Sequence, residues 1–585
     1  MPILPAMKTA LLAPSRVRTL SSPDRNRIQL APATERDRET IYRIRHEVFA
    51  HELGQHSPNS AALLRDALDD FNLYLVAKVA GEVAAFVSLT PPSAPSYSMD
   101  KYLAREQLPF AFDSQLYEVR LLTVVPTFRG SELAALLMYA AFRWVEAHGG
   151  TRLMAIGRRE VLELYLRGGL EPVGMAVQSG AVTYDVLQAP ISAIRERIQS
   201  FGGLLDRLES RVDWQLNFPF RRPAACFHGG AFFDAIGPRF DHLERHRNII
   251  NADVLDAWFP PSPQVLAALS EHPSWLLRTS PPTACEGLVE TIAEARGVAP
   301  ANILPGAGSS DLIFRALRHW LTPASHALIL DPTYGEYAHV LEKVIGCTVD
   351  RLTLAARDGF AVDLTRLESA LADDYNLVVL VNPNSPTGRH IPREQLEAVL
   401  RRAPQRTRIW VDETYVEYAG PNQSLEHFAA TSENALVCKS MSKVYALSGA
   451  RVAYLCAGPH QLEALRAITP PWVVSLPAQV AAVRALQDPA YYAARYAETA
   501  ALREQFAVQL RKLGLKTVPG IANFILCQLP SHGPDAATVV KQCRKHGVFL
   551  RDASVMGSQL GTHALRIAVK DAETNGRIVD CLSAC

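Results

Sequence analysis

Three apolar runs, Leu377-Val-Val-Leu-Val381, Arg408-Ile-Trp-Val-Asp412 and Ala435-Leu-Val-Cys438, decide the fold of the carboxy-terminal part of this chain. Each run has the length of a strand, and stretches with helical spacing separate it from the next. A fourth run, Ala327-Leu-Ile-Leu330, precedes Asp331 and extends the pattern. Continuous Val, Ile and Leu runs that alternate with helices predict a mostly parallel sheet covered on both faces, within an α/β protein.

Polar residues follow these strands directly, at the edge where parallel sheets bind their ligands. Asp412 ends one strand, and Lys443 follows another, 31 residues later, within Lys439-Ser-Met-Ser-Lys443. A lysine amine can condense with an aldehyde, and an aspartate can keep a ring nitrogen protonated so that the ring withdraws electrons. The pair resembles the two halves of a pyridoxal-phosphate site. A helix N-cap is the alternative role for Asp412.

The composition predicts a multidomain protein with a small-molecule partner. The chain has 585 residues, of which 48% are hydrophobic and 20% charged, more than one core normally organises. Its net charge of +1 gives no reason to expect nucleic acid or a membrane as partner. Nine scattered cysteines without a CxxC pair predict a reducing, cytoplasmic location and no metal site. We find no run long and apolar enough to span a bilayer.

Changes in pattern along the chain predict its domains. Alternating strands and helices start near Arg27, helical spacing with charges follows Ser192, and prolines and glycines break the pattern near residue 220. For the amino terminus, an organelle transit peptide is the alternative to a tail. The predicted segments are a flexible tail (1–26), an α/β domain (27–190), a connecting helix and linker (191–224) and a cofactor domain (225–585), the last with a large part at about 250–475 and a small part at about 225–249 and 476–585.

A glycine-rich turn, Gly306-Ala-Gly-Ser-Ser310, opens a helix. Unpaired amides at the positive end of a helix dipole suit a phosphate dianion. An ordinary capping turn is the alternative. Arg451 lies eight residues after Lys443 and offers a guanidinium fork that matches phosphate oxygens.

Together these motifs resemble, in collinear order, the fold-type-I pyridoxal-phosphate enzymes of the class I/II aminotransferase group, specifically histidinol-phosphate aminotransferases and threonine-phosphate decarboxylases. The resemblance implies a homodimer in which Lys443 and Asp412 are catalytic, Tyr334 stacks on the cofactor, and Tyr415 bonds to its 3-hydroxyl. A buried core tyrosine is the alternative for Tyr334. The other cofactor contacts that it implies are Gly308, Ser309, Ser310, Asn384 or Ser385, Ser440, Ser442 and Arg451.

The same resemblance implies a substrate site at Arg566, Asn523, Arg551 and His228. Arg566 would hold a carboxylate or a phosphate; a solvated surface charge is the alternative. Several segments depart from the family pattern. Ser385 replaces the usual asparagine, Ala231 follows the opening His-Gly-Gly, residues 251–261 replace an Asn-Glu-Asn-Pro segment, and Thr279-Ser-Pro-Pro282 replaces an interfacial Tyr-Pro-Asp.

Residues 27–190 resemble GNAT acyltransferases, with features of N-acyl amino acid synthases. The strand from Glu118 to Val125 is followed by a turn and a helix, the arrangement that receives a coenzyme A pyrophosphate. Glu132, however, stands where glycine is usual, and its carboxylate would repel phosphate. Helix packing and a strand-end charge are the alternatives for Tyr165 and Glu118. The resemblance implies Glu118 as base, Tyr165 as acid and Arg129, Gly130 and Ser131 as contacts for acetyl-CoA, acyl-CoA or an acyl carrier.

The leading hypothesis is an aminotransferase-type enzyme that acts on an α-amino acid or related amine, with an amino-terminal domain that acylates an amine. The alternative is a decarboxylase, or an elimination or carbon–carbon bond-forming enzyme of a specialised pathway, joined to a degenerate GNAT-like domain. A third class, a cofactor-binding regulator, would carry a helical DNA-binding module. The α/β pattern of residues 27–190 disfavours it.

Overall fold

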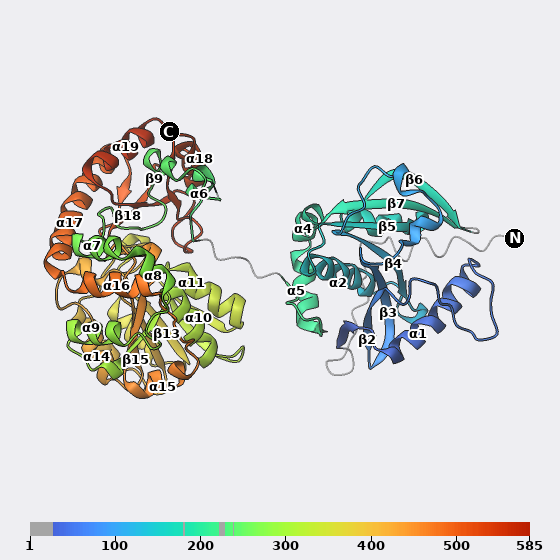
Figure 1. The fold of residues 1–585 in the computed structure, drawn as a ribbon, viewed down its shortest axis with the longest axis horizontal. Helices are drawn as coiled ribbons and strands as arrows, with labels where there is room; N and C mark the ends of the chain where they lie inside the picture. The colour runs from blue at the N-terminus through green and yellow to red at the C-terminus, as the bar shows by residue number, and fades with distance from the viewer. Residues whose placement is uncertain (1–26, 180–181, 222–227, 238) are drawn as a thin grey trace. The chain divides into compact units, whose positions relative to one another are not determined.

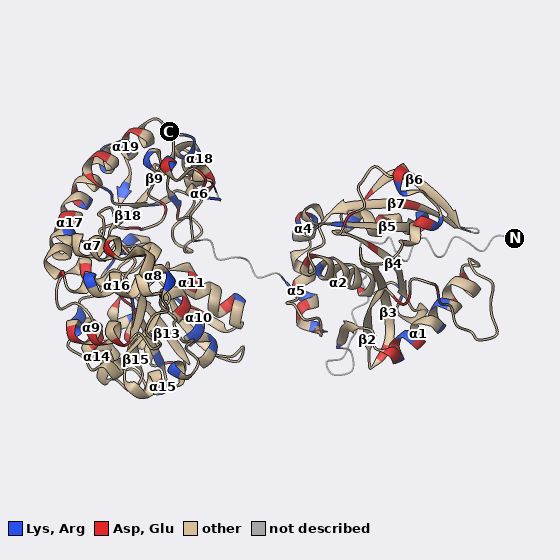
Figure 2. Cartoon of the chain, viewed as in Figure 1, with Lys and Arg blue, Asp and Glu red and all other residues tan. Residues whose placement is uncertain are grey.

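The structure is a computed structural model that describes residues 27–179, 182–221, 228–237 and 239–585. The chain divides into two compact units, residues 1–222 and 223–585, drawn as ribbons in Figure 1. Lys and Arg are interspersed with Asp and Glu on both units (Figure 2). No helix within the described ranges combines the length and the apolar character that a membrane span needs.

The amino-terminal unit is built on an eight-stranded sheet in the order β6-β7-β5-β4-β3-β2-β1-β8. Ala80 and Gly81 connect β2 to β3 with positive φ angles of 52° and 84°, as a two-residue hairpin of matching twist requires. Its elements are β1 (Ile28–Pro32), α1 (Glu35–Arg45), β2 (Leu73–Val79), β3 (Glu82–Thr90), β4 (Leu116–Val124), α2 (Leu133–Ala147), β5 (Arg152–Arg158), α3 (Leu162–Arg167), β6 (Glu171–Ser179), β7 (Val182–Pro190), α4 (Ile191–Gln199), α5 (Gly202–Arg211) and β8 (Val212–Trp214).

Helix α2 and strands β4 and β5 form the centre of this unit. α2 buries Leu133, Leu136 and Leu137 against the sheet because these residues share one helical face. β4 and β5 are parallel, with pairing from Leu116 to Val119 of β4. The segment that we expected to be a connecting helix instead forms α4, α5 and β8, and β8 pairs with β1 in the same sheet.

A seven-stranded sheet in the order β10-β16-β15-β14-β13-β11-β12 forms the core of the carboxy-terminal unit. Strands β11 to β15 pair in parallel, and β16 pairs antiparallel with both β15 and β10, so the predicted mostly parallel sheet is confirmed. The strands are β10 (Ile303–Gly306), β11 (His326–Asp331), β12 (Thr348–Thr353), β13 (Leu377–Val381), β14 (Arg408–Asp412), β15 (Ala435–Ser440) and β16 (Ala453–Cys456).

Both faces of this sheet are buried, as continuous apolar strands require. Ile409 and Val411 of β14 belong to one core cluster, whereas Trp410 between them belongs to another. α16 packs in the first cluster, with α7 and α9, through its alanines. The helices around the sheet are α7 (Pro263–Glu271), α8 (Pro273–Arg278), α9 (Glu286–Arg296), α10 (Ser309–Trp320), α11 (Gly335–Ala338), α12 (Leu364–Leu371), α13 (Arg393–Leu400), α14 (Glu426–Thr431), α15 (Pro459–Ala467) and α16 (Leu476–Leu486).

A smaller sheet, β17-β18-β21-β20, carries the rest of the carboxy-terminal unit. Strand β19 pairs with β9, which joins the start of this unit to its end. A third core cluster lies among these strands and helices α17 to α19. The elements are α6 (Phe232–Ile236), β9 (Ile250–Asn251), α17 (Pro489–Lys512), β17 (Lys516–Thr517), β18 (Phe524–Gln528), α18 (Ala536–Lys545), β19 (Val548–Phe549), β20 (Arg551–Asp552), β21 (Ala564–Ala568) and α19 (Ala572–Ser583).

A buried charge network lies beneath the end of β15. The Lys439 ammonium is 3% exposed and lies 2.7 Å from Glu417, 3.7 Å from Glu426 and 3.8 Å from Glu413. Arg296 adds a second cation, 3.2 Å from Glu417. Burial raises the pKa of Glu413 to about 7, which keeps much of this carboxyl neutral at neutral pH. The network fixes the strand that leads into residues 440–443.

We predict that Lys439→Met strongly destabilises the carboxy-terminal unit. The substitution leaves buried carboxylates without their ammonium, which costs about 3–5 kcal/mol. Denaturant unfolding followed by tryptophan fluorescence measures the loss. The control is Lys516→Met on exposed β17. An unchanged midpoint for Lys439→Met would show that the network does not hold this unit together.

Candidate functional site

The carboxyl ends of β11, β13, β14 and β15 lie side by side because these strands are neighbours in the sheet. They lead into the loops with Tyr334, Asn384, Asp412 and Lys443, so sequence segments more than a hundred residues apart meet at one edge. The structure thus brings the predicted cofactor residues to one edge of the sheet.

Asp412 is a buried carboxylate with uncharged hydrogen-bond donors. The Tyr337 hydroxyl donates to Oδ2 at 2.8 Å, and the amide and hydroxyl of Thr414 donate to Oδ1 at 3.0 and 2.6 Å. Trp410 donates in turn to Tyr337 at 2.7 Å. Burial raises the pKa of Asp412, and in the described part of the chain no cationic side chain forms an ion pair with it. A cation delivered to this carboxylate would therefore be strongly held.

The Lys443 amine lies next to an acid that the sequence reading missed. Its Nζ donates to Asp256 Oδ1 at 2.9 Å and to Ser448 Oγ at 3.4 Å. Burial lowers the pKa of Lys443, while Asp256 opposes that shift. Asp256 belongs to the segment 251–261 that departs from the family pattern, and this departure was the available signal.

A second, half-buried amine lies near this pair. Lys570 Nζ donates to the Asp256 carbonyl oxygen at 3.4 Å, and burial lowers the pKa of Lys570 to about 8. Nothing in the sequence around Lys570 indicated this position, because it depends on how the end of β21 meets residue 256.

The glycine-rich turn packs tightly against Arg451. Gly308 has a φ of +89°, and a Cβ at this position would lie 2.4 Å from Nη2 of Arg451. Helix α10 begins at Ser309, directly after this turn. Ser440 and Ser442 are buried, and the Ser442 amide donates to Ser440 Oγ at 3.3 Å. The turn therefore requires a glycine, and it combines a helix N-terminus with a guanidinium, as a phosphate cradle does.

Glu336 contacts three of the side chains that the sequence predicted for the cofactor and substrate site. Its Oε2 accepts hydrogen bonds from Tyr334 at 2.6 Å and Ser310 at 2.9 Å, and His228 Nε2 lies 2.5 Å away. Burial acts to raise the pKa of Glu336, but these three partners outweigh it and lower the pKa. Ser310 therefore contacts a carboxylate in this structure, and Glu336 is a further residue that the sequence reading missed.

In the loop after β13, the two predicted cofactor residues have different kinds of hydrogen-bond partner. Asn384 is bonded within the protein: Thr333 donates to its Oδ1 at 3.0 Å, and its Nδ2 donates to the Pro332 carbonyl at 2.9 Å. Ser385 Oγ accepts from Arg566 Nη1 at 3.2 Å. Asn384 thus shapes the loop, and Ser385 is the member that faces the predicted substrate residues.

Two buried arginines form the predicted substrate end. Arg566 donates to the Asp253 carbonyl at 2.9 Å, and Arg551 Nε lies 2.7 Å from the Asp253 carboxylate. Burial lowers the pKa of Arg566 to about 10. Asn523 donates to the Leu255 carbonyl at 2.9 Å, and its buried Oδ1 has no hydrogen-bond partner among the described residues. Two buried guanidiniums next to an unsatisfied amide oxygen suit a substrate with an anionic group and a donor.

Tyr415 packs its ring against Phe524, with centroids 5.3 Å apart. It is buried, and burial raises its pKa. It follows Asp412 by three residues, so its position depends on the turn after β14.

The charged and hydrogen-bonding groups at this edge of the sheet fit pyridoxal phosphate. In the described part of the chain no cation pairs with the buried Asp412 carboxylate, a protonated ring nitrogen would supply one, and the turn at Gly308 and Arg451 suits the phosphate. Lys443 supplies the amine.

In the amino-terminal unit, the predicted coenzyme A contacts are engaged within the protein. Arg129 forms two hydrogen bonds to Glu52, at 2.7 and 2.6 Å. Ser131 Oγ donates to the Phe128 carbonyl at 2.6 Å, and Gly130 has a φ of +81°. Glu132 forms an ion pair with Arg211 at 2.5 Å. The side chains at this turn therefore fit a pyrophosphate poorly.

The predicted acid and base of this unit are both buried, on different elements. Glu118 in β4 accepts hydrogen bonds from the Ser98 amide, at 2.7 Å, and from the Ser98 hydroxyl, and burial raises its pKa. Tyr165 in α3 is packed against β5, and burial raises its pKa to about 12. The described residues include no hydrogen bond between Glu118 and Tyr165.

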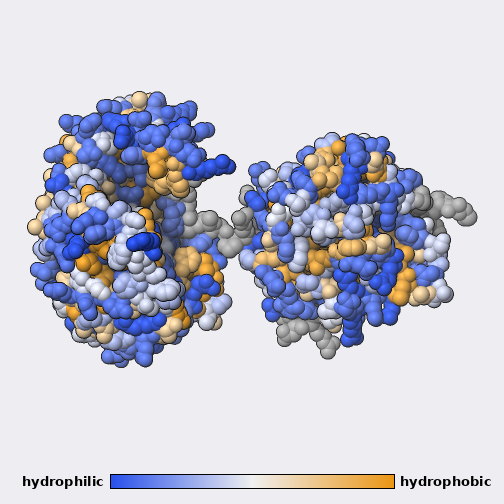
Figure 3. All heavy atoms as spheres, viewed as in Figure 1, coloured by the Kyte–Doolittle hydropathy of each residue, from blue (hydrophilic) through white to orange (hydrophobic). Residues whose placement is uncertain are grey.

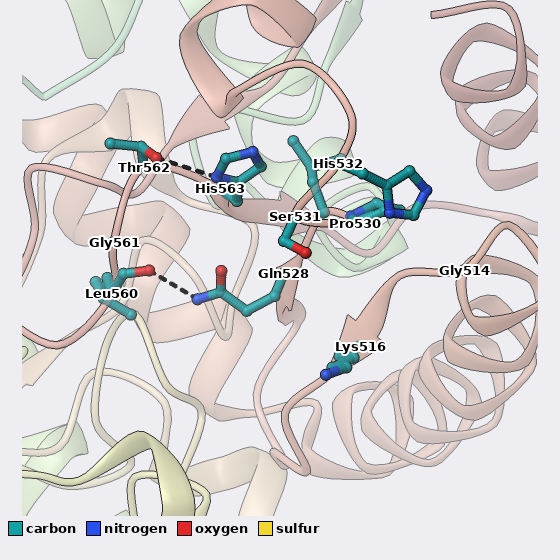
Figure 4. Close-up of a pocket in the computed structure, with 11 residues that line it drawn as sticks. Gly514, Lys516, Gln528, Pro530, Ser531, His532, Leu560, Gly561, Thr562 and His563 are labelled. Atoms are coloured by element: carbon teal, nitrogen blue, oxygen red, sulfur yellow. Dashed lines mark hydrogen bonds between the residues drawn. The ribbon is translucent and has the colours of Figure 1, made fainter.

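A hollow of about 610 Å³ lies elsewhere, on the smaller sheet (Figure 4). In it, His563 is hydrogen-bonded to Thr562 at 3.0 Å, and Gln528 donates to the Leu560 carbonyl at 2.9 Å. None of the predicted cofactor residues lines it. The hollow does not coincide with the edge at Lys443.

Known proteins resemble both units. The family described as aminotransferase class I and II matches residues 255–582, and the acetyltransferase (GNAT) family matches residues 38–168. Histidinol-phosphate aminotransferase 1 of Thiobacillus denitrificans is 32% identical over 357 residues, which cover 59% of this chain and 89% of that protein. Histidinol-phosphate aminotransferase 2 of Gluconobacter oxydans is 31% identical over 328 residues, which cover 55% and 87%.

Solved structures share the carboxy-terminal fold. Histidinol-phosphate aminotransferase of Sinorhizobium meliloti in complex with pyridoxal-5'-phosphate superposes with a TM-score of 0.52 at 24% identity, covering 62% of this chain and 97% of that one. L-threonine-O-3-phosphate decarboxylase of Porphyromonas gingivalis gives a TM-score of 0.51 at 21% identity, covering 57% and 99%. With the matched families, these likenesses establish that the chain belongs to the aminotransferase class I and II family and joins to it an amino-terminal GNAT-family domain.

Proposed function

We propose that the carboxy-terminal unit is a pyridoxal-phosphate enzyme that transaminates an α-amino acid or related amine. The observation that carries the proposal is the buried Asp412 carboxylate, bonded to neutral donors only among the described residues, at the same sheet edge as the Lys443 amine. Pyridoxal phosphate, when bound, supplies the electron-withdrawing ring that stabilises negative charge at the substrate Cα. The chain supplies the counter-charge, the amine and the binding groups.

Each group has a defined task in this proposal. Asp412 holds a proton on the ring nitrogen, and the bond from Tyr337 fixes the direction in which the carboxylate points. The turn at Gly308 and Arg451 binds the phosphate. The Lys443 amine is free after the substrate amine has taken its place at the cofactor. It would then carry a proton to and from the substrate Cα, as a base whose pKa burial lowers.

The anionic end of the substrate is assigned to Arg566, with Ser385 and Arg551 beside it. Two relatives named for histidinol phosphate make a phosphorylated amine one substrate to test. How Arg566 holds a carboxylate decides which Cα bond breaks, so decarboxylation, elimination and carbon–carbon bond formation in a specialised pathway are the alternative reactions.

We also propose a cytoplasmic homodimer, which sedimentation velocity tests. Exposed Trp275 and Leu277 on α8, and apolar patches on the carboxy-terminal unit (Figure 3), support an interface.

We predict turnover of an amine with loss of Cα–H and release of a keto product. The experiment is mass spectrometry of products from an amino-acid panel that includes histidinol phosphate, with the cofactor-loaded protein and an α-keto acid that accepts the amino group. Lys443→Ala should lose at least a hundredfold in rate, because it removes the proton carrier, whereas exposed Lys343→Ala should not. Release of carbon dioxide instead would assign decarboxylation, and turnover by Lys443→Ala at the normal rate would contradict the role of Lys443.

We predict that Asp256→Asn lowers the pKa of the Lys443 amine in the cofactor-free protein. The Asp256 carboxylate favours the ammonium, so its removal favours the neutral amine and lowers the pKa further. The pH profile of Lys443 modification by an amine-reactive reagent, read by peptide mass spectrometry, should move to lower pH. Asp358→Asn on an exposed turn is the control. A profile that stays in place or moves upward would rule out this pairing.

For the amino-terminal unit we infer a degenerate domain that does not transfer acyl groups from coenzyme A. Arg129 is held by Glu52, and Glu132 occupies the turn where a pyrophosphate would approach. The competing hypothesis is acylation of the amine that the other unit handles.

We predict no heat of binding when acetyl-CoA is titrated into the full chain in a calorimeter. Glu52→Gln releases Arg129 and removes one negative charge. A weak signal that appears only in this variant would confirm that the ion pair blocks the turn. Binding by the unaltered chain that disappears in Arg129→Ala would refute the inference and restore acyl transfer.

A further inference from the structure

Three cysteine thiols converge between two helices of the smaller part of the carboxy-terminal unit. Cys543 lies in α18, Cys581 lies in α19, and Cys585 follows the end of α19. The sulfur atoms of Cys543 and Cys585 are 3.7 Å apart, and the three sulfur atoms all lie within 4.8 Å of one another. Among the residues that the structure describes, this is the only group of three His, Cys, Asp or Glu side chains whose ligand atoms lie this close.

Local structure explains the convergence. Cys581 and Cys585 are four residues apart, and the chain continues the helical turn past α19, because the Cys585 amide donates to the Leu582 carbonyl at 3.3 Å. Residues at this spacing share one face of a helix. Cys543 is fully buried beneath that face, in the core formed by α18, α19 and the smaller sheet. Figure 1 shows α18 and α19 next to the carboxy terminus.

The spacing matches metal ligation better than a disulfide. Two thiolates that each lie about 2.3 Å from one tetrahedral zinc ion are about 3.8 Å apart. The distance of 3.7 Å between the sulfur atoms of Cys543 and Cys585 is close to this value. No pair among the three sulfur atoms is more than 4.8 Å apart, so a sulfur atom would have to move by only about 1 Å to reach it. A disulfide requires sulfur atoms at about 2.05 Å, so this pair would have to approach by well over an ångström.

We propose that Cys543, Cys581 and Cys585 bind one thiophilic d¹⁰ cation, such as Zn²⁺, through three thiolates, and that a water or a small ligand completes the tetrahedron. Sulfur donors select such ions. Cys581 and Cys585 are half-buried, so an ion can reach the site from solvent, whereas Cys543 closes its inner side. The bound ion ties α18 to α19. None of these residues belongs to the sheet edge at Lys443, so the site is independent of the proposed reaction.

The binding step balances as three thiols plus one divalent cation giving a metal tris-thiolate and three protons. Because binding releases protons from the thiols, affinity for the ion should increase as the pH rises.

The test is a titration of the reduced full chain with Cd²⁺, followed by ultraviolet thiolate-to-cadmium absorption, with Zn²⁺ as competitor. One Cd²⁺ should bind per chain, and Zn²⁺ should displace it. Cys581→Ser and Cys585→Ser should each weaken binding at least about tenfold, because even the loss of an outer-shell partner costs 10–100-fold. Cys347→Ser, a buried cysteine outside the cluster, is the control and should bind normally.

Circular dichroism of the Cys581→Ser and Cys585→Ser variants distinguishes loss of a metal ligand from misfolding. Both variants should show the spectrum of the unaltered chain in the absence of metal. Absence of the absorption, equal binding by all variants, or an intact mass lower by two hydrogens that maps to a disulfide among these three cysteines in the protein as purified would each overturn the proposal.

Discussion

A buried carboxylate with only uncharged hydrogen-bond donors among the described residues is the constraint on which the carboxy-terminal site depends. Asp412 lies at the end of the central strand β14 and is 3% exposed, and neutral groups of Tyr337 and Thr414 hold it. Burying such a charge costs free energy unless an opposite charge compensates it. In the proposed function a cationic ring would supply that charge, and the turn at Gly308 and the Lys443 amine lie at the same edge of the sheet.

The sheet and its supporting charges keep these groups in register. Parallel pairing of β13, β14 and β15 sets the ends of the strands side by side. Beneath them, Lys439 and Arg296 pair with Glu417 and Glu426, so the segment leading to Lys443 rests on a largely buried ionic layer. In the amino-terminal unit, Glu52 and Glu132 instead pair with the unit's own arginines, Arg129 and Arg211.

The sequence predicted the elements with strong local signals. Apolar runs such as 377–381 indicated the parallel strands, and Lys443, Asp412 and the turn at Gly308 followed from residue types that few other roles require. Asp256, Glu336 and Lys570 escaped because their importance depends on contacts between segments distant in sequence. Likewise, residues 191–214 have helical spacing, but only the paired strands show that β8 completes the first sheet. The partner that ties up Arg129 lies 77 residues away and gave no local signal.

The most direct measurement is borohydride reduction of the protein loaded with pyridoxal phosphate, followed by peptide mapping of the labelled lysine. Three lysines of the carboxy-terminal unit, the buried Lys439 and the half-buried Lys443 and Lys570, make the outcome discriminating. We predict a single label on Lys443, because Lys439 is held by three carboxylates and Lys570 lies beyond Asp256. A label on Lys439 or Lys570, or none at all, would contradict it.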